Sequence, residues 1–243
     1  MNTYFFGGPI TRTVKALIAI NLAVYVLQII FHQLDSHFID LYLGLVPFRV
    51  THELMLWQLV TYMFLHGGVF HIFFNMLTLF MFGNELERYW GTHRFLSYYF
   101  ITGIGAGICS WLVAMITGNG WSIIIGASGA IYGLLLAYGM TYPNRIVYLN
   151  FLVPVKVKWM VIIMGAIAFL SSISGSEPGV ANIAHLGGML AGYLLLKGSD
   201  WAGKYRLFSE QRQREQLKKQ FEVYYGDVRR KIENDKKRGP TIH

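Results

Sequence analysis

The sequence predicts an all-α polytopic membrane protein, built as a bundle of six transmembrane helices. Hydrophobic residues make up 54% of its 243 positions and charged residues only 14%, whereas a soluble domain carries about a quarter charged residues. The charges are also unevenly placed, because the last 47 positions hold 20 of the 34 charged residues, 13 basic and 7 acidic. The remaining body cannot cover a water-exposed surface. An ordinary cytosolic enzyme, a disordered chain and a nucleic-acid module are therefore excluded, although the net charge is +8.

Charge-free stretches locate the individual helices. A helix needs about 20 apolar residues to cross roughly 30 Å of hydrocarbon, and stretches of about this length recur along the chain, with a turn signal at residues 117–120. Lipid offers no partner for unpaired backbone groups, so these spans should be helical. We expect them near residues 15–34, 69–89, 95–117, 126–142, 158–175 and 179–197.

The distribution of basic residues predicts the orientation. With six spans both termini lie on one side, and this side holds 20 of the 21 lysines and arginines. Basic residues in short loops mark the cytoplasmic side. We therefore expect a multi-pass protein of the cell inner (plasma) membrane, with a membrane domain of residues 1–197 and a basic cytoplasmic helical tail of residues 198–243. The tail should contact anionic lipid rather than nucleic acid.

The first outer loop, from about Asp35 to Phe70, is too long for a simple turn. It mixes apolar residues with charged ones, which indicates that it lies at the membrane interface or folds back against the bundle. Two interpretations of this loop stay open. It shields helix ends, or it gates a functional site.

Polar residues inside a span are costly and therefore suggest function. His71 and Asn75 are four residues apart in the second span, so they share one helix face and can donate hydrogen bonds toward one point. Helix–helix polar contacts are the structural alternative. Zinc is a further alternative, because His66, His71 and His185 all offer imidazole nitrogens, but these segments contain no nearby carboxylate.

A second polar group opens the fourth span, with the sequence Gly126-Ala127-Ser128-Gly129. Ser128 falls at the helix N-terminus, where backbone N–H groups are free. Tyr132 follows one turn later on the same face. The glycines allow a neighbouring backbone to approach closely, and simple packing is the alternative explanation.

The third polar group lies in the sixth span. His185, Gly188 and Gly192 follow the three-to-four-residue spacing of one helix face. A helix packing against this face would come close to the imidazole, and the glycines near Ser128 are suited to that contact.

Together these groups provide the components of acyl transfer. Ser128 is the expected nucleophile, and His185 is the expected general base and then acid. His71 and Asn75 are expected to stabilise the oxyanion. The spans contain no Asp or Glu placed to orient the histidine, so a Ser-His dyad is predicted, with Tyr132 packing against the imidazole.

At these residues the sequence resembles the rhomboid family of intramembrane serine proteases, in its six-span bacterial form. The resemblance covers roughly residues 10–197 and rests on four motifs, H-x-x-x-N, G-x-S-G with a following tyrosine, A-H-x-x-G-x-x-x-G and G-x-x-x-E-x-x-x-G. The matching residues are His71 and Asn75, then Gly126, Ser128, Gly129 and Tyr132, then Ala184, His185, Gly188 and Gly192, and finally Gly83, Glu87 and Gly91.

The resemblance implies cleavage of transmembrane substrates without a cofactor, and no site residue is expected to bind a metal. It implies a structural role for Glu87. It also implies that His66 stabilises the oxyanion or anchors a loop. The sequence departs from the family at Gln58, which follows Trp57 where many members have arginine. Substrate entry is expected past the first outer loop, or past the fifth span and residues 174–179.

Two other classes of protein remain as alternatives. A non-catalytic relative would hold membrane clients without cutting them, but such relatives generally lack the serine or the histidine, and both are present. A transporter is disfavoured because the chain shows neither a six-span inverted repeat nor an intramembrane carboxylate suited to proton coupling. The oligomeric state and the identity of the substrate are not predicted.

Overall fold

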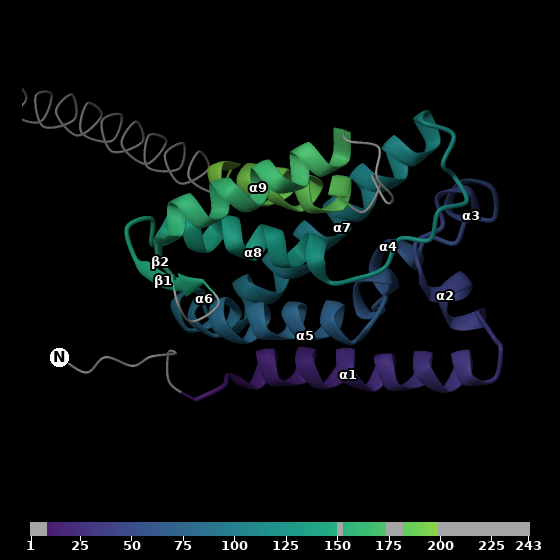
Figure 1. The fold of residues 1–243 in the computed structure, drawn as a ribbon, viewed down its shortest axis with the longest axis horizontal. Helices are drawn as coiled ribbons and strands as arrows, with labels where there is room; N and C mark the ends of the chain where they lie inside the picture. The colour runs from purple at the N-terminus through teal and green to yellow at the C-terminus, as the bar shows by residue number, and fades with distance from the viewer. Residues whose placement is uncertain (1–8, 150–152, 174–181, 199–243) are drawn as a thin grey trace, which may run out of the picture. The chain divides into compact units, whose positions relative to one another are not determined.

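The computed structural model describes residues 9–149, 153–173 and 182–198. These residues form helices joined by short loops, with one small hairpin (Figure 1). The elements are α1 (Arg12–Gln33), α2 (Phe38–Leu43), α3 (Pro47–His52), α4 (Gln58–Thr61), η1 (Tyr62–Phe64), α5 (Val69–Thr78), η2 (Leu79–Gly83), α6 (Asn84–Trp90), α7 (Thr92–Ile116), α8 (Ser128–Thr141), β1 (Ile146–Leu149), β2 (Val153–Lys156), α9 (Val157–Ile173) and a last helix at residues 182–198.

The helices confirm the predicted membrane bundle. Within the described residues, three helical stretches are long and apolar enough to cross a membrane, namely α1, the continuous stretch Val69–Trp90 and α7. The shorter helices α8 and α9 and the helix at residues 182–198 overlap the other three predicted spans. The predicted helical tail lies outside the described residues, as do residues 174–179.

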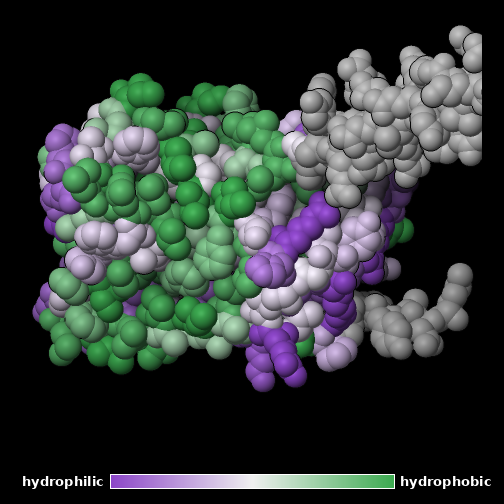
Figure 2. Space-filling model, turned by 180° about the vertical axis from the view of Figure 1, so that it is seen from behind, coloured by the Kyte–Doolittle hydropathy of each residue, from purple (hydrophilic) through white to green (hydrophobic). Residues whose placement is uncertain are grey.

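The surface of the bundle fits a lipid environment. Large apolar side chains are exposed along α1 and α9, where Val26 and Ile162 are more than half exposed. Figure 2 shows hydrophobic side chains over most of the visible body, with hydrophilic ones gathered toward its edges. Exposed apolar surface of this extent is stable against acyl chains and not against water.

Helix α8 lies in the middle of the bundle and packs against α5, α7 and α9 (Figure 1). Most of its residues are buried, including Gly129, Ala130 and Gly133. Small residues let the neighbouring backbones come close. The resulting van der Waals contacts hold helices together in lipid, where the hydrophobic effect between helices is absent. At Gly133, for example, an added Cβ would lie 2.7 Å from the Cβ of Thr102 on α7.

The hairpin β1–β2 is a departure from the predicted all-helical chain. Its strands pair antiparallel, with Ile146 opposite Lys156. Alternating β-branched residues favour extended backbone there. Arg145, just before β1, donates to the Glu85 carboxylate on α6 and lies over the rings of Tyr138 and Tyr142. These contacts tie the hairpin to the helix ends.

The first outer loop folds back against the bundle through α2, α3 and α4. Gln58 is completely buried, and its side chain hydrogen-bonds to backbone groups of this loop. Its Oε1 accepts from the Val46 N–H at 2.9 Å, and its Nε2 donates to the Leu41 carbonyl at 3.0 Å. The one side chain thus satisfies both a backbone donor and a backbone acceptor.

Candidate active site

Ser128 is held at the start of α8 by a tightly anchored turn. Gly126 has a φ of +126°, a conformation that L side chains rarely adopt, so the helix begins two residues after the predicted start of the span. The Gly126 N–H donates to the Tyr62 carbonyl at 2.9 Å, and Leu45 and Ile124 exchange two backbone hydrogen bonds of 2.9 Å. The serine hydroxyl therefore stands on a turn fixed to the first outer loop.

The structure brings Ser128 and His185 together. The Nε2 atom of His185 lies 2.8 Å from the Oγ atom of Ser128, although 57 residues separate them in the chain. The ring of Tyr132 stacks on the imidazole, with centroids 4.3 Å apart and planes inclined by 2°. This stack limits rotation of the His185 ring, which is hydrogen-bonded to the Ser128 hydroxyl.

Glycine makes this approach possible. A Cβ on Gly188 would overlap the carbonyl oxygen of Gly129, so the helix at residues 182–198 touches the backbone of α8 at this point. Gly192, one turn later, faces the hydroxyl of Tyr98 on α7 instead. The glycine face of the last helix is thus shared between two partner helices.

His71 approaches the serine from α5. Its Nδ1 accepts from the Gly67 N–H at 3.2 Å, so the neutral ring carries its proton on Nε2. A Cβ added to Gly126 would lie 2.8 Å from this Nε2 and 3.7 Å from the Ser128 hydroxyl. The Nε2 side of the His71 ring therefore lies near the nucleophile, with Gly126 leaving room for it.

Asn75 lies one turn after His71 on α5 and is buried, with 5% of its surface exposed. Within the described part of the chain its side-chain amide makes no hydrogen bond. Its donors are consequently available to a group that enters beside α8, which packs against α5.

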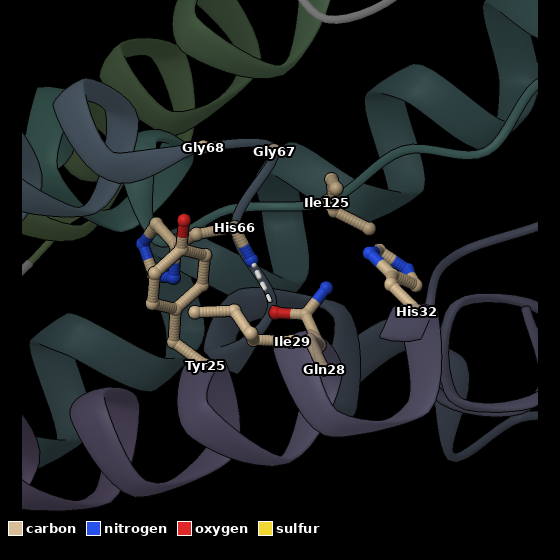
Figure 3. Close-up of a pocket in the computed structure, with 8 residues that line it drawn as sticks. All are labelled: Tyr25, Gln28, Ile29, His32, His66, Gly67, Gly68 and Ile125. Carbon is tan, nitrogen blue, oxygen red and sulfur yellow. Dashed lines mark hydrogen bonds between the residues drawn. The ribbon is translucent and has the colours of Figure 1, made fainter. Parts of the chain in front are cut away.

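His66 lies outside the transmembrane helices, on the segment that leads into α5. Its backbone N–H donates to the Gln28 side chain at 2.9 Å (Figure 3). Its ring is 2% exposed and meets the His71 ring edge to face at 5.1 Å. Burial, followed by the proximity of His71, lowers the His66 pKa to about 4, so the imidazole is neutral. These contacts fit a loop anchor that supports His71.

Figure 3 shows a pocket of about 110 Å³ beside this anchor, where Tyr25, Gln28 and His32 of α1 face His66 and Gly67. The pocket lies between the end of α1 and the segment before α5. It does not include Ser128.

A family model described as the Rhomboid domain matches residues 53–198. The chain belongs to the rhomboid family. This confirms the resemblance drawn from the four motifs and the polytopic helical bundle in the membrane.

Curated rhomboid proteins align with more than half of this chain. Rhomboid protease AarA of Providencia stuartii is 34% identical over 208 residues, which cover 79% of this chain and 73% of that protein. RHOMBOID-like protein 1 of Arabidopsis thaliana is 37% identical over 147 residues, covering 60% and 35% respectively. RHOMBOID-like protein 5 of the same plant is 34% identical over 155 residues, covering 63% and 47%. The chain thus spans less than half the length of these plant relatives.

Three supporting groups of this rhomboid protein were not identified from the sequence. They are the Gly67 N–H that fixes the His71 tautomer, the Tyr62 carbonyl that holds Gly126, and Gln28, which holds the His66 backbone. Two are main-chain atoms, which leave no side-chain signal. Gln28 is a buried amide in an apolar span, and its polarity was a signal that could have been followed.

Proposed function

We propose that this rhomboid protein is an intramembrane serine endopeptidase, which hydrolyses peptide bonds in or near transmembrane segments of other proteins. The observation that supports it most directly is the 2.8 Å hydrogen bond between Ser128 and His185. A serine hydroxyl is a weak nucleophile until a neighbouring base accepts its proton. Rhomboid protease AarA, named as a protease, provides independent support.

The chemistry divides into two steps. The Ser128 oxygen attacks the scissile carbonyl carbon while His185 takes the hydroxyl proton, and the His71 N–H and the Asn75 amide stabilise the resulting oxyanion. Collapse of this intermediate breaks the C–N bond, and the amine leaves with the proton from His185. Water then attacks the acyl-enzyme while His185 takes its proton, and His185 returns this proton to the Ser128 oxygen as the acyl C–O bond breaks and the acid product is released. No cofactor takes part.

The membrane setting determines which substrates can react. The substrates are transmembrane segments, whose peptide bonds are protected by helical hydrogen bonds and must unwind before attack. Helix-weakening residues such as glycine or proline near the scissile bond should therefore favour cleavage. Water exclusion strengthens the oxyanion hydrogen bonds.

The orientation follows from the basic residues. We place residues 1–197 in the inner membrane as the catalytic domain, with both termini and the tail of residues 198–243 in the cytoplasm. The active site then opens to the extracytoplasmic side, because Ser128 begins a helix that runs toward the cytoplasm. Membrane lipids contact the body and the basic tail.

The decisive experiment measures cleavage of a model transmembrane substrate by purified protein in detergent. Ser128→Ala and His185→Ala should each lower the rate by about 10⁴–10⁶-fold. Thr141→Val is a matched hydroxyl control at the far end of α8, where the hydroxyl caps the Ala137 carbonyl at 2.8 Å. It should keep the activity. Retained cleavage in either dyad variant would reject the proposal.

A non-catalytic protein that holds membrane clients is the alternative, since some family functions need no cleavage. Labelling with a serine-directed fluorophosphonate separates the two, because only an activated serine reacts. We expect labelling in the unaltered protein and in Thr141→Val and none in Ser128→Ala. Absence of labelling in all three favours the alternative.

A further inference from the structure

Three potential metal ligands meet at the end of α1 that joins the first outer loop. His32 lies in the last turn of α1, His37 immediately precedes α2, and Asp40 lies in α2. The His32 Nε2 is 2.5 Å from the Asp40 Oδ2, and the His37 Nδ1 is 3.6 Å from the same oxygen. All three ligand atoms lie within 4.8 Å of one another.

The carboxylate at the centre of this group is unusual in its surroundings. The Asp40 side chain is only 11% exposed. Within the described residues, the ion-pair partners of Asp40 are the two imidazoles, with no lysine or arginine among them. A buried carboxylate is stabilised by a nearby positive charge. A bound cation would supply this charge.

We propose that His32, His37 and Asp40 form a binding site for a divalent transition-metal ion, with Zn²⁺ as the best match. Two imidazole nitrogens and one carboxylate oxygen are a donor set that zinc accepts, whereas Mg²⁺ and Ca²⁺ prefer oxygen alone. The site is distinct from the serine site, and it does not depend on the proposed protease activity.

The geometry needs only a small adjustment to accept the ion. Zinc bonds of 2.0–2.2 Å in tetrahedral geometry place neighbouring ligand atoms about 3.3 Å apart. The His37–Asp40 separation of 3.6 Å is close to this value, and the 2.5 Å His32–Asp40 contact must widen. His32 and His37 have the freedom to move, because their side chains are 43% and 73% exposed. The same exposure gives the ion a path in and leaves a coordination position for water.

A supporting contact orients the central ligand. The Gln28 amide donates to the Asp40 Oδ1 at 2.8 Å, so the other carboxylate oxygen is directed at the histidines. Outer contacts of this kind fix metal ligands in position. The same Gln28 side chain holds the His66 backbone through its oxygen, and Figure 3 shows Gln28 and His32 on the same side of α1. A bound ion would therefore stiffen the junction between α1, the outer loop and the segment before α5.

The test titrates the untagged full-length protein in detergent with Co²⁺, whose visible absorption reports bound ligands. We expect one saturable Co²⁺ site per chain. Zn²⁺ should displace Co²⁺ from this site, and Mg²⁺ should not. His37→Ala, an exposed position at which folding is not at risk, should weaken Co²⁺ binding at least about 10-fold. His32→Ala should behave likewise. His93→Ala, which removes an exposed histidine on α7, should bind as the unaltered protein does.

The proposal is overturned if the unaltered protein shows no saturable Co²⁺ absorption, or if His37→Ala binds Co²⁺ as tightly as His93→Ala. Either result would leave the group as a histidine–aspartate ion pair. The outcome is independent of proteolysis, because Ser128→Ala should bind Co²⁺ normally.

Discussion

The rings of Tyr132 and His185 lie parallel, 4.3 Å apart between centroids, while the imidazole holds the Ser128 hydroxyl. If the stack positions the base, Tyr132→Phe should retain activity and Tyr132→Ala should lower kcat roughly 2- to 10-fold, since such stacks contribute about 0.5–1.5 kcal/mol. The cleavage rate of a transmembrane substrate checks this. Equal losses in both variants would assign the role to the phenol hydroxyl instead.

The Nε2 side of the His71 ring lies beside Gly126, two residues before Ser128. If it stabilises an oxyanion, His71→Ala should lower kcat about 10²–10³-fold. KM should change little, because the interaction forms only in the transition state. Val69→Ala, an exposed change on the same helix, is the control and should keep both constants. A rise in KM with kcat unchanged would make His71 a substrate-binding residue.

The close contact between Gly188 and the Gly129 backbone predicts that a larger side chain at Gly188 disturbs helix packing. A Cβ there would overlap the Gly129 carbonyl, so Gly188→Ala must push apart the two helices that carry Ser128 and His185. Overpacking of this kind costs about 1–3 kcal/mol. Thermal unfolding in detergent should show a lower midpoint, and cleavage should fall with it. Gly198→Ala lies on the same helix with nothing within 4 Å of the added Cβ, and it should leave both unchanged.

The sequence predicted the helices well because hydropathy over about 20 residues reports directly on lipid exposure. The span predicted near 15–34 matches α1 at Arg12–Gln33, and that near 69–89 matches the stretch Val69–Trp90. The π-helical turn at Leu79–Gly83 inside the second span was not predicted. A π turn has the same hydropathy as an α turn, so it leaves no signal in composition.

The candidate site was predicted in its residues but not in its supports. Ser128 and His185 were paired from glycine spacing, which indicates where helices can touch. The tautomer of His71 depends on one backbone N–H, and the turn before Ser128 depends on the Tyr62 carbonyl. Main-chain atoms are the same in every residue, and only the fold determines which of them meet.

Gln58 tests how the outer loop is stabilised. Arginine at this position could donate to the Leu41 carbonyl but could not accept from the Val46 N–H. Gln58→Arg should therefore leave a buried donor unpaired and destabilise the protein by about 1–3 kcal/mol. Unfolding in detergent measures this. Gln33→Arg, an exposed change of the same type at the end of α1, should be neutral. Equal stability of both variants would show that the loop rearranges to accept arginine.

His66 predicts how stability depends on pH. Its folded pKa of about 4 lies below the ordinary 6.5, so between these values the unfolded chain binds more protons than the folded one. The stabilisation is complete above pH 6.5 and is lost as the pH falls through 4, by up to about 3 kcal/mol. His66→Leu should reduce this slope by the contribution of one histidine, whereas His52→Leu, on the exposed end of α3, should keep it in full. Unfolding midpoints in detergent from pH 7.5 to 4 measure the difference, and identical slopes in both variants would assign the acid sensitivity to other groups.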